Sequence, residues 1–377
     1  MHKNLVQKIM SKVRIFAGIY LNKVYQGPYQ VYVNLTDICN LNCLMCPVYS
    51  PLVQKDEQAH PKEYLRRDVL DNLSDSLTNL KVQLVTITGG GEPFLHPHLM
   101  DFVRKLCRAK KDVTIVTNGT IIKEEQLTEL LRLDVNLRFS LIAASPEKYL
   151  EVHPNQTAAT FDRLKNTLAL IKDFRKKIPS RSVVSILFVI FKNNFHEMPI
   201  MLNMGKEYNV DFVHFKPTIF PQEEMKGLFL DDIDLKRLRD IIESVQKTYD
   251  ISSTDLTSFS NELERNQKLI ENHGISDQRR STPCYKGWTF CWILANGDVA
   301  PCCDCNISVG NINDEPFEKI WKSEKYSELR RSMATQHSGI IRLTDCRCDT
   351  CAPDHEEIKI SKGLRFIKGS AYGDEAV

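Results

Sequence analysis

Six apolar, strand-like runs alternate with amphipathic helical patterns between residue 30 and about residue 220 of the chain. The helical patterns include residues 124–133 and 160–174, where apolar side chains recur every three or four positions. This alternation predicts an α/β fold of parallel strands, rolled into a full or partial barrel with its chemistry on the loops that follow the strands. The six runs comprise residues 31–36, 82–88, 113–118, 137–143, 183–191 and 210–217.

The other segments differ in composition and predict a chain of five parts. Residues 1–28 hold five Lys or Arg and no acid, which indicates a basic amphipathic helix. Such a helix either contacts anionic lipid or packs on the barrel with a solvated basic face, and we favour packing. The predicted parts are this helix (1–29), the barrel (30–222), a helical connector (223–275), a cysteine-rich domain (276–360) and a tail (361–377).

The composition excludes several classes of protein. With 377 residues, 26% of them charged, and a net charge of +2, the chain is typical of a globular enzyme rather than a nucleic-acid-binding protein. No apolar run is long enough to cross a bilayer, and no signal peptide is evident. Twelve cysteines without a secretory signal indicate a reducing, cytoplasmic compartment, where thiols serve metals or chemistry.

Three cysteines follow the first predicted strand in the pattern C-x3-C-x2-C, at Cys39, Cys43 and Cys46. No fourth cysteine is near, since the next is Cys107, which falls on the apolar side of a predicted helix and is expected in the core. Zinc, a catalytic dithiol and an iron–sulfur cluster all remain possible for this spacing. A four-iron cluster held by three thiolates would keep one iron open for another ligand, as catalytic metal sites do.

The segment "CNLNCLMC" after a first strand resembles the signature of the radical S-adenosylmethionine (SAM) superfamily. This resemblance implies a partial (β/α)6 barrel with a [4Fe–4S] cluster at Cys39, Cys43 and Cys46, whose open iron binds SAM. It also implies reductive cleavage of SAM to a 5′-deoxyadenosyl radical that abstracts hydrogen from a substrate. A reductant such as flavodoxin or ferredoxin would supply the electron.

Further segments match the family in the expected order. "TITGGGEPFLHP" resembles its glycine-rich segment, so Gly89, Gly90 and Gly91 are expected to let the backbone approach a ligand closely. The resemblance implies that Glu92 faces the methionine ammonium of SAM, that Asn118 in "TNGT" lines the site, and that Ser140 contacts the ribose or carboxylate of SAM.

One departure from the family concerns the SAM carboxylate. Relatives often carry an arginine shortly before the helix that here begins near "TFDRL", and His153 stands roughly in its place. A histidine offers a weaker, pH-dependent charge. The carboxylate is therefore expected to be held by Ser140, or by Lys192, Asn193 or Asn194 in "FKNNF".

Eight cysteines form a second group between residues 284 and 351. The "NGD" at residues 296–298 lies between apolar residues and predicts a hairpin. With "VGNI", "IWKS" and a closing C-x2-C, this region resembles the SPASM/Twitch domain of some radical SAM enzymes. The resemblance implies one auxiliary [4Fe–4S] cluster; Cys291 is the next candidate ligand after the favoured set of Cys284, Cys302, Cys348 and Cys351. Zinc is the alternative for such cysteine pairs.

The reaction is less constrained than the cofactors. An auxiliary cluster accepts an electron or positions the substrate, so the family relationship implies either dehydrogenation or epimerisation of a small, polar or sugar-like molecule. Modification of a peptide is the alternative, although only about 30 residues precede the first strand. For epimerisation, Cys291, Cys303 and Cys305 are the candidate hydrogen donors. A zinc-bound interaction protein and a simple electron carrier are the non-enzyme alternatives.

Overall fold

The computed structural model describes residues 2–53, 63–218, 223–249, 254–257, 259–263, 283–303, 305, 307–335 and 357–364. Its centre is a single curved sheet with the strand order β6-β5-β4-β3-β2-β1-β7-β8, parallel except for the β7–β8 pair. The strands are β1 (Gln30–Asn34), β2 (Leu84–Thr88), β3 (Asp112–Thr117), β4 (Asn136–Ser140), β5 (Val184–Ile190), β6 (Phe212–Pro217), β7 (Phe290–Ile293) and β8 (Val299–Ala300).

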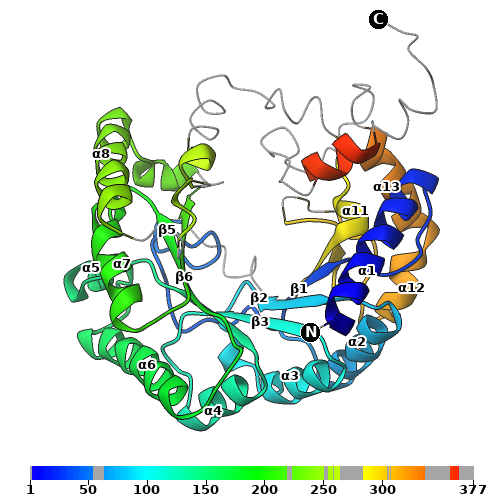
Figure 1. Cartoon of the computed structure of the whole chain (residues 1–377), viewed down its shortest axis with the longest axis horizontal. Coiled ribbons are helices and arrows are strands. Elements are labelled where there is room, and N and C mark those ends of the chain that lie inside the picture. Colours follow the sequence, from blue (N-terminus) through cyan, green and yellow to red (C-terminus); the bar gives the residue numbers. More distant parts are fainter. Residues whose placement is uncertain are drawn as a thin grey trace, which may run out of the picture.

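Helices cover the outer face of the sheet in an open arc, as Figure 1 shows. The helices along the barrel are α2 (Arg67–Asn79), α3 (Leu99–Arg108), α4 (Glu124–Arg132), α5 (Pro146–Val152), α6 (Ala158–Lys177), α7 (Met198–Glu207) and α8 (Asp232–Thr248). Short helical turns lie at η1 (Pro93–Leu95), η2 (Phe195–Glu197) and η3 (Glu223–Leu228). The helix α11 (Lys286–Thr289) contacts β7 and packs with α1 (His2–Leu21) and α13 (Glu324–Thr335), and α12 (Phe317–Lys322) packs on α2 and α13.

Side chains alternate between the two faces of each strand, which explains why the sequence folds this way. In β1, Val31 and Val33 are fully buried and join the core that the outer helices cover. Gln30 and Tyr32 point to the opposite, inner face of the arc. The inner face therefore carries polar and aromatic side chains and forms the concave side of a partial barrel. The predicted α/β partial barrel is confirmed, and each of the six predicted strands overlaps an observed one, with ends that agree within three residues.

The predicted hairpin forms, but its first strand extends the barrel sheet. The turn is closed by the bond from the Gly297 N–H to the Leu294 carbonyl at 2.9 Å, and Gly297 adopts a φ of 89° that favours glycine. β7 pairs in parallel with β1, with Cys291 beside Val31. The cysteine-rich region is thus joined directly to the first strand of the barrel. The predicted boundaries near residues 222 and 275, and all of the tail after residue 364, lie outside the described residues.

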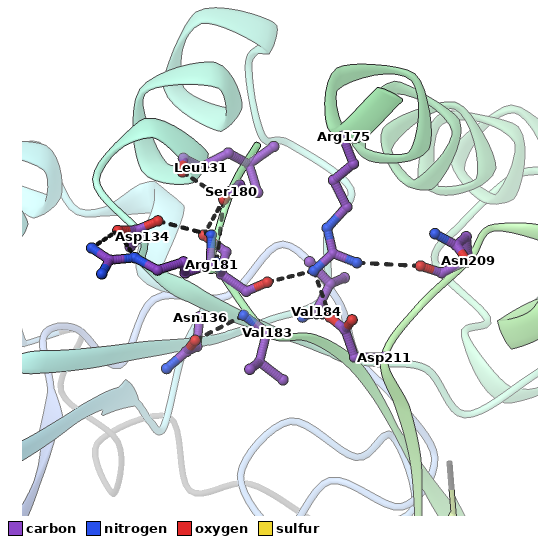
Figure 2. A network of polar contacts seen from close by, with 11 residues as sticks. Leu131, Asp134, Asn136, Arg175, Ser180, Arg181, Val183, Val184, Asn209 and Asp211 are labelled. Carbon is purple, nitrogen blue, oxygen red and sulfur yellow. Dashed lines mark hydrogen bonds and ion pairs between the residues drawn. The ribbon is translucent and has the colours of Figure 1, made fainter. Parts of the chain in front are cut away.

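A polar network fixes the ends of β4, β5 and β6 where these strands begin (Figure 2). The Asn136 side chain accepts the Val183 N–H at 2.9 Å, and Asp211 accepts the Val184 N–H at 2.7 Å. Arg175, half-buried, binds Asp211 and the carbonyls of Ser182 and Asn209. This end of a barrel is typically devoted to stability, which leaves the opposite strand ends for chemistry.

Among the described residues, no helix is both long and apolar enough to cross a bilayer.

Candidate active site

The loop that follows β1 gathers Cys39, Cys43 and Cys46. The Cys46 N–H donates to the Cys43 carbonyl at 3.0 Å, which turns the loop back on itself. Two backbone N–H groups point at sulfur: Leu41 donates to Cys39 Sγ at 3.5 Å and Tyr49 donates to Cys46 Sγ at 3.3 Å. Such N–H groups stabilise thiolates that hold a negatively charged cluster.

The three thiols are close enough to influence one another. Burial, together with the charges of Glu92 and Cys46, raises the pKa of Cys39 to about 11. Burial also raises the pKa of Cys43, with added repulsion from Cys46 and Cys39. Iron binding must therefore displace protons from this loop. The described residues contain no three His, Cys, Asp or Glu side chains placed around a single metal ion. Three neighbouring thiols, with backbone N–H groups directed at two of them, are a donor set that suits a four-iron cluster.

The glycine-rich turn after β2 packs directly on the cysteine loop. The Glu92 N–H donates to the Ile38 carbonyl at 2.8 Å. A β-carbon at Gly91 would lie 2.2 Å from the Ile38 oxygen, and one at Gly90 would lie 2.3 Å from Asp37 Oδ1. The sequence predicted that these glycines let the backbone approach a ligand closely. In the structure, the segment that the two glycines approach is the one that carries Cys39. A contact between the turn and SAM stays a prediction.

Glu92 joins the ends of β2 and β3. Its buried carboxylate accepts the Thr117 hydroxyl at 2.7 Å, the Asn118 N–H at 2.8 Å and the Phe94 N–H at 3.2 Å. Burial raises the pKa of Glu92 to about 7, although these three donors lower it. The Asn118 side chain in turn donates to Asn40 of the cysteine loop at 3.0 Å. A contact between Glu92 and the SAM ammonium stays a prediction.

The candidates for holding the SAM carboxylate have different surroundings. Ser140 lies half-buried on the inner face at the end of β4. His153 is buried, its Nδ1 lies 3.0 Å from the Tyr149 carbonyl, and burial lowers its pKa to about 4. It is therefore neutral at pH 7 and supplies no positive charge. The remaining candidates have protein partners: Lys192 pairs with Asp231 at 2.8 Å, Asn193 donates to Glu151 at 2.7 Å, and Asn194 donates to the Ile142 carbonyl at 2.9 Å.

Sequence reasoning missed Arg138, which lies on the inner face two positions before Ser140 in β4. In the part of the chain that the structure describes, it forms no ion pair, and its Nε is buried without a hydrogen-bond partner. The other basic side chains on the inner face, His214 and Lys216 of β6, have acidic partners. The signal for Arg138 was its two-residue spacing from Ser140 within the predicted strand at residues 137–143.

The second cysteine group is only partly described. Cys284 is buried, Cys302 is half-buried and Cys303 is exposed. Cys305 is buried and disulfide-bonded. Cys291 is fully buried on the outer face of β7, where burial raises its pKa to about 12 and Tyr326 of α13 lies beside it. That face points away from the barrel interior. Cys346, Cys348 and Cys351 lie outside the described residues.

Comparisons with known families match both cysteine groups. The radical SAM superfamily matches residues 33–205, and an iron–sulfur cluster-binding (SPASM) domain matches residues 284–352. The chain belongs to the radical SAM superfamily. It is an enzyme whose cofactors are a SAM-binding four-iron cluster, SAM and auxiliary iron–sulfur, as its sequence predicted. Which cysteines ligate the auxiliary iron stays a prediction.

Relatives of this radical SAM protein cover most of its length. A tungsten-containing aldehyde ferredoxin oxidoreductase cofactor-modifying protein of Pyrococcus furiosus is 26% identical over 85% of the chain and 88% of its own length. An AdoMet-dependent heme synthase of Methanosarcina barkeri is 26% identical over 81% of the chain and 85% of its own length. Streptococcus suis SuiB, solved with S-adenosylmethionine bound, has the same fold at 16% identity, with a TM-score of 0.60 over 83% of the chain and 70% of SuiB.

The contact between the glycine turn and the cysteine loop predicts the effect of Gly91→Ala. The added methyl group must push the Ile38 carbonyl away and so displace Cys39. We expect iron content to fall after anaerobic reconstitution, and SAM cleavage without substrate to slow by about 100-fold. Gly227→Ala is the matched control, because a β-carbon there meets nothing within 4 Å. Equal iron content and cleavage in both variants would contradict this role.

Buried, neutral His153 predicts a specific acid sensitivity. Its pKa of about 4 in the folded protein lies below the ordinary value of 6.5, so the unfolded chain takes up the proton first as the pH falls. Its stabilising contribution is present above pH 6.5 and is lost toward pH 4, by about 3 kcal/mol in total. His153→Asn keeps a donor for the Tyr149 carbonyl and has no such proton.

Thermal unfolding of the two proteins between neutral pH and pH 4 measures this effect. We expect the melting temperature of the wild type to fall more steeply than that of His153→Asn. Parallel curves over this range would show that His153 does not titrate with unfolding.

Proposed function

We propose that this radical SAM enzyme dehydrogenates a small polar substrate that carries a carboxylate or another anionic group, and that Arg138 holds this group. The observation that carries the proposal is half-buried Arg138 on the inner face of the sheet, whose Nε is buried without a hydrogen-bond partner. A cation removed from water is costly unless an anion and hydrogen-bond acceptors offset the loss of hydration.

The neighbours of Arg138 supply no such anion. It is flanked in register by Val116 of β3 and Ser185 of β5, neither of which is acidic. By contrast, His214 Nδ1 lies 3.2 Å from Asp255, and Lys216 Nζ lies 2.7 Å from Glu262. The two basic side chains of β6 are thus paired with acids from residues 255–262, whereas the described residues pair Arg138 with no acid. Its planar donors suit a carboxylate or phosphate.

Other side chains on the inner face suit an oxidation. With its Nδ1–H donated to Asp255, His214 keeps Nε2 as a base that can take the proton leaving the substrate. Tyr32, Phe290 and Trp292 form an aromatic wall, which the bond from Trp292 Nε1 to Asn34 Oδ1 fixes at 2.7 Å. When bound, SAM and its cluster supply the radical that removes one hydrogen atom, and the auxiliary cluster accepts the second electron.

Dehydrogenation is favoured over epimerisation because of the cysteine positions. An epimerase needs a thiol that faces the substrate, whereas Cys291 faces the helices outside the barrel. Cys305 is disulfide-bonded in this structure. Cys303, which is exposed, is left as the stronger candidate among the three for a hydrogen donor.

A second candidate function is modification of a peptide. Its support is the shared fold with SuiB, which has also been solved bound to the precursor peptide SuiA, with a TM-score of 0.60 over 83% of this chain. An acidic residue of a peptide would satisfy Arg138 equally well, so the size of the substrate distinguishes the two functions.

A deuterated metabolite extract tests the proposal without a known substrate. The extract is separated into small anionic, small neutral and peptide fractions, and deuterium transfer into 5′-deoxyadenosine is measured by mass spectrometry. We expect transfer from the small anionic fraction, a loss of about 100-fold in Arg138→Met, and partial retention in Arg138→Lys. Cleavage of SAM without substrate should persist in both variants. Transfer from the peptide fraction alone would favour the second candidate.

Turnover in deuterated water separates oxidation from epimerisation. Oxidation predicts a product two hydrogens lighter, without solvent deuterium on the reacting carbon, and unchanged turnover in Cys303→Ala. Solvent deuterium in the product, together with loss of turnover in Cys303→Ala, would overturn the proposed dehydrogenation and establish a thiol hydrogen donor.

A further inference from the structure

Helix α1 packs on the protein through one face only. Ile15 and Ile19 lie in a small apolar cluster with Tyr285, Trp288 and Leu364. The same side of the helix includes Ser11, which accepts a hydrogen bond from Gln26 at 2.6 Å. In Figure 1, α1 runs along the outside of the molecule beside α11 and α13. The helix is thus anchored along one side and exposed along the other.

The exposed side of α1 is an apolar stripe rather than the solvated basic face that we favoured from the sequence. Val6, Ile9, Met10, Val13 and Tyr20 are 59%, 52%, 43%, 54% and 45% exposed. At 100° per residue these five positions share one side of the helix, opposite Ile15 and Ile19. Single exposed apolar residues are ordinary, but a continuous stripe usually meets a partner.

Basic residues border this stripe. Residues 1–28 contain five Lys or Arg and no acid, and on the helix Lys12 and Arg14 lie on opposite sides of the stripe. Lys12 also lines a cavity of about 430 Å³ together with Lys286 and Lys359, and none of the described residues that line it is acidic. Lys12 and Arg14 therefore flank the apolar stripe of α1, one on each side.

We propose that α1 docks this enzyme on an anionic membrane surface, with the apolar stripe in the boundary between headgroups and acyl chains. Interfacial helices combine an apolar face with flanking Lys and Arg in this way. A protein partner is less suited, because one convex helix side is far smaller than the roughly 800 Å² per partner that a stable interface buries. This proposal is independent of the substrate and of Arg138.

Vesicle flotation of the anaerobically loaded, full-length enzyme tests the proposal. The vesicles contain phosphatidylcholine alone or with about one third phosphatidylglycerol. We expect binding to the anionic vesicles only, and a marked decrease at about 0.5 M salt. The variant Ile9→Ser/Val13→Ser removes apolar area and keeps every charge, so its binding should fall by about tenfold or more.

Ile233→Ser is the matched control, because Ile233 is 64% exposed but lies on α8. It should bind vesicles as the wild type does. Both variants should retain SAM cleavage without substrate, which confirms that they fold. No wild-type binding to anionic vesicles, or equal binding by the double variant, would overturn the proposal. So would a dimer in solution that the double variant abolishes while vesicle binding is absent, because the stripe would then be a contact between copies of the chain.

Discussion

The hydrogen bond from the Glu92 N–H to the Ile38 carbonyl is the contact on which the site depends. It joins the turn after β2 to the loop that carries Cys39, and two glycines make the approach possible because any β-carbon would collide. The Glu92 carboxylate extends the same connection to β3 through Thr117 and Asn118. Three strand ends are thereby held together around one cysteine loop, and the backbone contacts of these segments set the positions of the thiols.

The parallel pairing of β7 with β1 has a similar consequence on the other side of the loop. It makes the start of the SPASM region a continuation of the barrel sheet, so the two cysteine groups are linked through adjacent strands. This arrangement disfavours Cys291 as a hydrogen donor to the substrate. The register that places Trp292 on the inner face puts Cys291 on the outer face, against Tyr326. The polar inner face, where Arg138 lies with its Nε unpartnered, is the surface that we propose for the substrate.

Much of the fold followed from the sequence because strand and helix periods are local signals. The six barrel strands, the cysteine loop and the "NGD" hairpin were predicted on that basis. Long-range strand pairings were not predicted, because no local sequence signal near residues 290–293 indicates that they lie beside β1. The environment of a titratable group was equally hidden: His153 was expected as a pH-dependent cation, and only its burial against Tyr149 shows that it is neutral. Arg138 was missed because an arginine in a strand signals nothing until its neighbours are known to be uncharged.

We expect the thiolates of Cys39, Cys43 and Cys46 to hold a four-iron cluster and to leave one iron open for SAM. Iron analysis and 5′-deoxyadenosine release after anaerobic reconstitution, in the wild type and in a Cys39→Ala/Cys43→Ala/Cys46→Ala variant, test it most directly. We predict about eight irons per wild-type chain and SAM cleavage under reductant, with about four irons and no cleavage in the variant. A colourless zinc protein, or a variant that still cleaves SAM, would contradict the account.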